Sequence, residues 1–242
     1  MKRGQPRAAC TILLILCCVV GAPTAHATTI ALDVGHSLTK PGATSARGVP
    51  EFVFNRALAL VLRDELQARG FTVLTIGEKG DVRDLYSRPA SAKGADLLLS
   101  VHHDSVQPHY LKDWQYSGKR HQMSDRFSGF SLFVSRSNLY PTMSLSCASS
   151  IGAALRNAGV HPSAYHAQQI PGENRPFADE INGVHYFDDL VVLKTATLPA
   201  VLLEAGVIVN PADELLLSEP ATRQKIAAAV ASAMSCLTKS AQ

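Results

Sequence analysis

Histidine and carboxylate side chains stand at the ends of three hydrophobic segments that have the composition of buried strands. His102 and Glu204 come directly after such a segment, and His36 follows one after a single glycine, Gly35. Glu51 follows His36 by the length of a loop, at the predicted start of a helix. Because the carboxyl ends of parallel strands meet at one edge of a sheet, we expect these four side chains to lie close together.

Two imidazoles and a carboxylate around an open position form a ligand set for catalytic zinc. His36, Glu51 and His102 fit this role, and Glu204 fits that of a general base beside the metal. Taken alone, His36 is more typical of a hydrogen-bonded loop histidine, and Glu51 of a solvated acid or one favoured at a helix start. Glu204 is less easily explained in this way, since a carboxylate in a buried strand needs a cation, a metal or a shifted pKa.

Two histidines are adjacent at the end of the second of these segments. Neighbouring residues of a strand point to opposite faces of the sheet, so only one of His102 and His103 is expected to reach a shared metal. The other is expected to contact a neighbouring residue or to pack elsewhere.

Strand and helix patterns alternate along the chain. Strands are predicted at 28–34, 71–76, 95–101, 129–135 and 198–203, and helices at 51–69, 145–157 and 220–237. Residues 82–93 also have a helical pattern, but Pro89 predicts two short turns or a kinked helix there. This alternation predicts a single α/β domain. We expect a mostly parallel or mixed twisted sheet of about six strands, with helices on both faces and the zinc site at the carboxyl ends of the strands.

The first residues have the pattern of a secretory signal peptide. A basic start precedes an apolar run over 8–22, and an Ala-x-Ala site ends at Ala27. The run is shorter than the roughly twenty residues that span a bilayer, so cleavage is favoured over an uncleaved anchor. We therefore expect a signal peptide at 1–27 and a periplasmic mature chain at 28–242 that is not an integral membrane protein.

Removal of this segment changes the charge balance. The full chain has 23 Lys and Arg against 20 Asp and Glu, a formal net charge of +3. The segment contains Lys2, Arg3 and Arg7 and no acid, so 20 basic and 20 acidic residues remain in the mature chain. Its formal net charge is zero, and the absence of a basic stripe argues against nucleic acid as a partner.

Three of the five cysteines also belong to the export segment, which leaves Cys147 and Cys236. An exported chain with two cysteines could form one disulfide. Because both lie in predicted amphipathic helices, two buried free thiols are the favoured interpretation.

The segments that carry these residues resemble the zinc-dependent type-3 N-acetylmuramoyl-L-alanine amidases, a family of bacterial cell-wall hydrolases. The resemblance covers nearly the whole mature chain. It rests on ALDVGH at 31–36, Glu51 followed by Asn55, Arg88, ADLLLSVHHDS at 95–105, and VVLKTATLPAVLLEAGVIVN at 191–210. Each piece alone is weak, whereas their order and spacing together are specific.

The resemblance implies that His36, Glu51 and His102 bind Zn²⁺ and that Glu204 is the general base acting on zinc-bound water. The reaction it implies is hydrolysis of the amide bond between the lactyl group of N-acetylmuramic acid and L-alanine in peptidoglycan. Asn55 and Arg88 would support the site or contact substrate. A protein activator is a partner compatible with the family, and we expect the chain itself to be a monomer.

The chain departs from the family pattern after the second histidine, where Ala-Asn is common and His103-Asp104 stands instead. Asp104 could orient His102 as a supporting carboxylate or cap the next turn, and His103 is expected to be structural. Two polar stretches, at about 104–128 and 161–188, are also long for loops. They could line a substrate groove, form a lid or regulatory plug, or be solvated.

Two other functions use the same features. A zinc peptidase or carboxypeptidase would apply the same chemistry to stem peptides. A non-catalytic module that binds the cell wall would have lost a metal ligand or the base, and the presence of all four residues argues against it.

Overall fold

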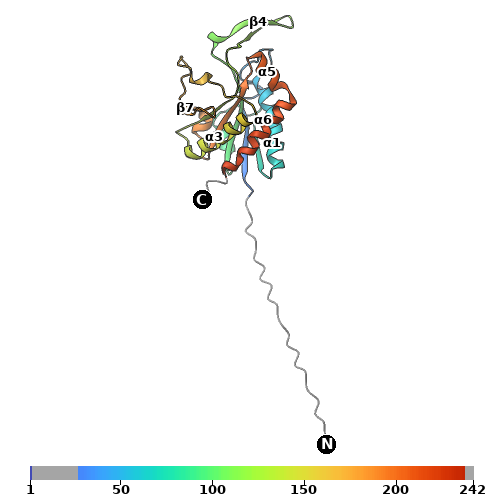
Figure 1. Cartoon of the computed structure of the whole chain (residues 1–242), viewed down its shortest axis with the longest axis vertical. Coiled ribbons are helices and arrows are strands. Elements are labelled where there is room, and N and C mark those ends of the chain that lie inside the picture. Colours follow the sequence, from blue (N-terminus) through green and yellow to red (C-terminus); the bar gives the residue numbers. More distant parts are fainter. Residues whose placement is uncertain (2–26, 238–242) are drawn as a thin grey trace.

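The computed structural model describes Met1 and residues 27–237, and its centre is a seven-stranded sheet (Figure 1). The strands lie in the order β2-β1-β3-β9-β6-β8-β7. Their bounds are β1 Thr29–Val34, β2 Thr72–Ile76, β3 Leu97–Asp104, β6 Ser131–Val134, β7 Phe177–Asp179, β8 Val184–Tyr186 and β9 Ala200–Val207. The helices are α1 Glu51–Ala68, α2 Ser87–Ser91, α3 Pro141–Asn157, α4 Val191–Lys194, α5 Pro211–Ser218 and α6 Pro220–Ser232.

The sheet is mixed, which is one of the two arrangements expected from the sequence. Strands β2, β1, β3 and β9 are parallel, whereas β6 runs antiparallel to β9, and β7 antiparallel to β8. The expectation of one α/β domain is confirmed, with seven strands instead of about six. The additional strands β7 and β8 are three residues each, too short to show a period of two in the sequence.

The two faces of the sheet are covered differently. Ile30, Leu32 and Val34 of β1 pack into a large core with the long helices α1, α3 and α6. Ala31, on the opposite face, belongs to a smaller cluster that includes residues of α4. Since side chains alternate along a strand, alternate residues of β3 and β9 are directed to the thinly covered face, where room remains for a ligand.

The polar stretch at 104–128 contains a hairpin that the sequence patterns do not predict. Strands β4 (Lys112–Tyr116) and β5 (Lys119–Met123) pair antiparallel and form a sheet of their own. The hairpin projects from one end of the molecule, away from the main sheet (Figure 1). Most of its side chains are exposed, so no apolar alternation marks these strands.

The predicted export segment lies almost entirely outside the described residues, since only its first and last residues are described. Within the part of the chain that the structure describes, no helix has both the length and the apolar character that a membrane crossing requires.

The two cysteines outside the export segment are joined, so the favoured expectation of free thiols is wrong. Cys147 of α3 and Cys236 of the terminal 3₁₀ turn Ala233–Leu237 form a disulfide with a Cα–Cα distance of 5.2 Å. The predicted closing helix ends as an α-helix at Ser232, and the tighter turn beyond it packs on α3. Both residues are helical and both face the core, and the sequence could not predict that these two faces meet.

This disulfide should stabilise the fold substantially, because it links positions 89 residues apart and so restricts the unfolded chain. Reduction, or replacement of both cysteines by alanine, is expected to lower the free energy of unfolding by about 2–5 kcal/mol. Denaturant unfolding of the wild-type chain with and without dithiothreitol measures this. The doubly substituted chain is the control and should not respond to dithiothreitol; equal stability of the oxidised and reduced wild type would contradict the expectation.

Candidate metal centre and cavity

Three of the residues singled out from the sequence meet at one edge of the sheet. His36 follows β1, Glu51 begins α1 and His102 lies in β3. His36 Nε2 is 2.9 Å from Glu51 Oε2, and His102 Nδ1 is 3.0 Å from Glu51 Oε1. One donor atom from each side chain lies within 4.8 Å of the others, which suits a single cation.

The Glu51 carboxylate is buried and firmly held. Its Oε1 accepts hydrogen bonds from the Asn55 amide (3.0 Å) and the His103 backbone N–H (3.3 Å), and its Oε2 accepts from the Ala43 backbone N–H (3.0 Å). Burial raises the pKa of Glu51, but its contacts with the two imidazoles outweigh burial and hold the pKa well below its ordinary value. Glu51 is therefore an anion, as a metal ligand must be.

Two glycines allow His36, Glu51 and His102 to lie close together. A Cβ on Gly35 would lie within 2.6 Å of the His102 ring. Gly42 has φ +80°, and a Cβ there would lie 2.6 Å from the His36 ring and closer still to the Glu51 carboxylate. His36 itself has φ 68°, a conformation that non-glycine residues adopt rarely and usually at functional sites.

Arg88 holds the strained backbone of His36 through hydrogen bonds. Its guanidinium, which is buried, donates to the backbone carbonyl oxygens of His36 and Val34 and to Asp33 Oδ1 at 2.6 Å. Ser100 donates to the other Asp33 oxygen at 2.7 Å. The ion pair is thus fully hydrogen-bonded, as a buried pair must be to persist.

Asn55 and His103 lie behind the cluster, on the helix-covered face. The Asn55 amide nitrogen donates to Glu51 and to the Gly35 carbonyl oxygen (3.2 Å), so its oxygen must face His103. That oxygen can only accept, so Nδ1 of His103 carries a proton and donates to it at 2.8 Å. Burial lowers the pKa of His103 to about 3, and the ring is neutral. His103 faces away from the metal side, as strand alternation predicts.

Glu204 lies on β9 as the direct neighbour of His102 on β3. Both strands continue beyond their predicted ends, so these residues belong to paired strands instead of following them. Glu204 Oε2 is buried without a hydrogen-bond partner in the described chain. Burial raises the pKa of Glu204 well above its ordinary value, and the negative charges of Asp104 and Glu51 add to the effect.

Asp104 pairs with a residue that the sequence analysis did not place in the site. Its Oδ1 accepts from the Ser105 backbone N–H (2.7 Å), and its Oδ2 contacts His166 Nε2 (2.7 Å). These contacts do not support the expectation that Asp104 orients His102, because Asp104 binds His166 instead. His166 Nδ1 in turn contacts Glu173 Oε2 (2.8 Å).

His166 is thus held between two carboxylates. Burial lowers its pKa, but Asp104 and Glu173 outweigh burial and raise the pKa to about 9, so the ring is a cation at neutral pH. No local signal could have found this arrangement, because His166 lies 62 residues from Asp104 and in an irregular polar stretch.

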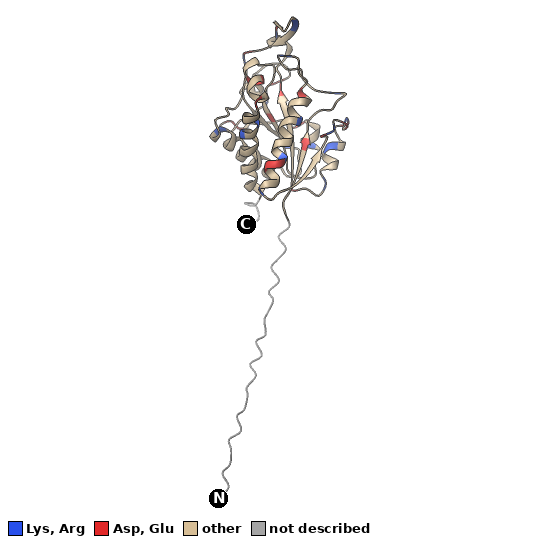
Figure 2. Cartoon of the chain, turned by 90° about the vertical axis from the view of Figure 1, so that its right-hand side faces the viewer, with Lys and Arg blue, Asp and Glu red and all other residues tan. Residues whose placement is uncertain are grey.

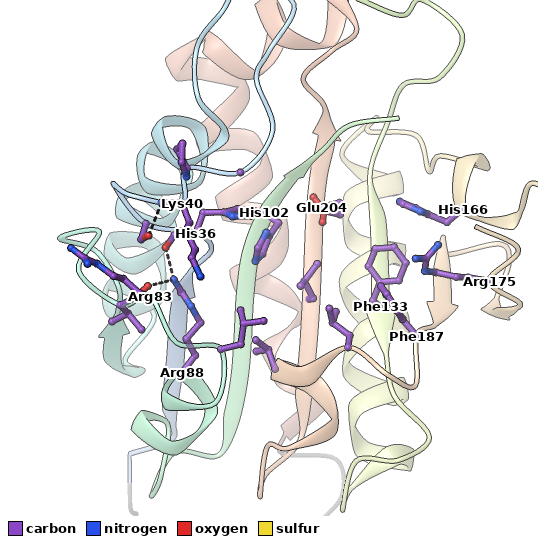
Figure 3. A pocket seen from close by; sticks show the side chains of 18 residues that line it. His36, Lys40, Arg83, Arg88, His102, Phe133, His166, Arg175, Phe187 and Glu204 are labelled. Atoms are coloured by element: carbon purple, nitrogen blue, oxygen red, sulfur yellow. Dashed lines mark hydrogen bonds between the residues drawn. The ribbon is translucent and has the colours of Figure 1, made fainter. Parts of the chain in front are cut away.

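A cavity of about 650 Å³ opens on the thinly covered face, with His102 and Glu204 near its middle (Figure 3). The labelled residues on one side of them are His36, Lys40, Arg83 and Arg88, and those on the other are Phe133, His166, Arg175 and Phe187. Among the described residues that line it, Glu204 is the one carboxylate beside four Lys and Arg residues. The cavity therefore suits a ligand that carries negative charge and apolar groups.

The donor set fits zinc. Two imidazoles and one carboxylate are the ligand types of catalytic zinc sites with an open position. Glu204 is the adjacent carboxylate that hydrolytic zinc sites require, and its buried oxygen has no competing partner. The other supporting residues proposed from the sequence, Asn55 and Arg88, contact Glu51 and the His36 backbone, respectively.

Comparison with known proteins identifies relatives of this chain and of its fold. The family model described as N-acetylmuramoyl-L-alanine amidase matches residues 30–236. The N-acetylmuramoyl-L-alanine amidase AmiA of Escherichia coli (strain K12) is 26% identical over 230 residues, which cover 84% of this chain and 73% of that protein.

Solved structures share the fold. The N-acetylmuramyl-L-alanine amidase Ami1 from Mycobacterium smegmatis matches with a TM-score of 0.69 at 22% identity, over 88% of this chain and 97% of that one. The CwlD amidase from Clostridioides difficile, solved in complex with the GerS lipoprotein, matches with a TM-score of 0.62 at 19% identity, over 88% and 99%.

Gly42 lies against Glu51 and His36, so the Cβ added by Gly42→Ala would displace one of these side chains. We therefore expect this substitution to disrupt the metal centre formed by His36, Glu51 and His102. We expect zinc bound per chain, measured by atomic absorption after dialysis, to fall well below that of the wild type. Gly94→Ala is the control: Gly94 has φ +89° and open space around it, so the substitution has the backbone strain of about 1–2 kcal/mol without the contact. Equal zinc content in both variants would contradict the prediction.

His166 should make stability depend on pH. A histidine whose pKa is raised from 6.5 to about 9 on folding stabilises the native state fully below pH 6.5, and this contribution disappears as the pH rises through 9. Its upper limit is about 3 kcal/mol. His166→Gln should therefore lower the melting temperature strongly at pH 6 and only slightly at pH 9.5. A pH-independent difference between the two proteins in thermal unfolding would rule this out.

Proposed function

The chain belongs to the N-acetylmuramoyl-L-alanine amidase family, and we propose that it hydrolyses the amide bond between the lactyl group of N-acetylmuramic acid and L-alanine in peptidoglycan with zinc as cofactor. The observation that carries this proposal is the His36, Glu51 and His102 cluster beside the unpartnered buried oxygen of Glu204. When bound by these three side chains, zinc supplies a Lewis acid that polarises the amide carbonyl and lowers the pKa of water.

Glu204 is the general base in this proposal. Its raised pKa makes the carboxylate ready to take a proton from the attacking water, and Oε2 has no partner to give up first. The same oxygen then donates that proton to the amine nitrogen of L-alanine as the bond breaks. The neighbouring position of Glu204 and His102 on paired strands keeps the base beside the metal ligands without a flexible loop.

The cavity supports a peptide as one part of the substrate. Exposed Lys40 and Arg83 stand on one side of the cluster, and neither has an ion-pair partner among the described residues. Stem peptides carry free carboxylates, which such cations attract. Phe133 and Phe187 offer apolar surface to peptide side chains on the other side.

The setting of the reaction follows from the same proposal. Peptidoglycan lies outside the cytoplasm, so a cleaved export segment at 1–27 and a periplasmic catalytic domain at 28–242 are consistent with it. We keep a monomeric chain and a protein activator as proposals. The activator is supported by the solved complex of the CwlD amidase with a lipoprotein.

Glu204→Gln is expected to retain zinc and lose turnover. The amide has nearly the shape of the carboxylate but cannot accept the proton, so kcat should fall by about 10²–10⁴-fold. Release of intact stem peptide from muropeptides, followed by mass spectrometry, measures activity, and atomic absorption measures zinc.

Removal of zinc by a chelator should abolish activity, and zinc should restore it in the wild type alone. Substantial turnover by Glu204→Gln or by the metal-free enzyme would refute the mechanism. Release of single amino acids or shortened stems, with the bond to muramic acid intact, would indicate a peptidase instead.

A further inference from the structure

A second cavity, of about 720 Å³, lies between the β4–β5 hairpin and the segment that leads into α1. Its lining is Ala43, Thr44, Ser45, Ser105, Leu111, Asp113, Arg120, His121, Gln122 and Val209. The hydroxyl, amide, imidazole and charged groups in this set offer both hydrogen-bond donors and acceptors. The lining thus differs from that of the first cavity, which combines cations with aromatic and aliphatic surface.

This cavity adjoins the metal centre directly. Ala43, at its wall, donates its backbone N–H to Glu51, and the preceding Gly42 lies against His36 and lines the first cavity. The segment from Gly42 to Ser45 therefore separates the two cavities. A linear substrate whose reacting bond lies at the metal centre can place one end in each of them.

The hairpin is held firmly to this segment. Trp114 Nε1 donates to the Ala46 carbonyl oxygen at 2.7 Å, and the Arg47 guanidinium lies 5.5 Å from the Trp114 ring centre and 5.2 Å from that of Tyr116. The two rings are stacked with 15° between their planes, and Tyr116 is 40% exposed. These contacts fix the hairpin against the segment, and the two rings lie beside the cavity without being part of its lining.

The charges around the second cavity are already paired. Arg120 pairs with Asp113 across the hairpin, Lys112 with Asp125 at 2.8 Å, and Arg47 with the buried Glu214. Figure 2 shows basic residues at the far end of the hairpin, and of these Arg120 is the one at the cavity. These ion pairs leave a polar lining with little net charge, which favours a neutral ligand rich in hydroxyl and amide groups over an acidic peptide.

We infer that the second cavity binds the glycan strand, namely the neutral N-acetylated sugars that neighbour the reacting muramic acid. The inference rests on the proposed function, which requires a substrate with a sugar on one side of the reacting bond and a peptide on the other. A sugar whose lactyl carboxyl is bound in the amide carries no charge and matches the second cavity. The charged peptide matches the first.

The test compares two substrates that carry the same stem peptide, N-acetylmuramoyl peptide with a single sugar and glycan strands of several disaccharide units. Gln122→Ala removes a side chain from the lining, and Gln115→Ala is the matched control on the same hairpin, outside the lining. The preference for the strand, as a ratio of kcat/KM values, should fall about five-fold in Gln122→Ala, the effect of one hydrogen bond, and stay at the wild-type value in Gln115→Ala.

Binding of chitotetraose, a neutral N-acetylglucosamine oligomer, is measured in parallel by equilibrium dialysis on the zinc-loaded chain. Trp114, the sole tryptophan of the sequence, reports by its fluorescence whether the sugar binds at the hairpin. The inference predicts saturable binding that changes this fluorescence, with a Kd about five-fold weaker in Gln122→Ala than in Gln115→Ala.

Failure of the inference and failure of the proposed function have different signatures. If the wild type cleaves both substrates but the two variants behave alike, or chitotetraose does not bind, the glycan site is wrong and the amidase stands. If the wild type cleaves neither substrate but binds chitotetraose through Gln122, the reaction is wrong and the sugar site stands. Displacement of chitotetraose by sugar-free stem peptide would assign the second cavity to peptide and overturn the inference.

Discussion

The buried Glu51 carboxylate is the group around which the candidate site is arranged. A charge removed from water must be compensated by polar contacts, and here two backbone N–H groups, one amide and two imidazoles supply them. These partners come from the end of β1, the segment before α1, α1 itself and β3. The carboxylate therefore fixes the relative positions of four parts of the chain, and the supporting contacts of Asn55 and Arg88 act on the same parts.

The chemistry lies on the face of the sheet that the long helices leave free. Alternate residues of β3 and β9 enter the large core with α1, α3 and α6, and the residues between them face the cavity. This division explains how His102 and Glu204 can be exposed to a ligand although both belong to central strands. It also explains why His103, one position further, is a neutral buried ring on the helix side.

Those parts of the site that depend on local periodicity could be predicted from the sequence. The strand-end positions of His36 and His102 and the opposite directions of His102 and His103 follow from alternation and from the geometry of parallel sheets. The hairpin could not be predicted, because its strands bury no apolar face and so carry no alternating pattern. The disulfide and the His166 network could not be predicted either, because each joins segments more than sixty residues apart through tertiary packing.

The position of the hairpin has a consequence for how this chain can vary in length. Deleting one residue of β3 ahead of His102 would exchange the faces of all later side chains of the strand and place His103 where His102 now stands. The hairpin begins only a short segment after β3, yet it pairs with itself and contributes no strand to the main sheet. Residues can therefore be gained or lost at its exposed turn without shifting the register of β3 against β9. The length of this surface is thus uncoupled from the geometry of the metal centre a few residues earlier.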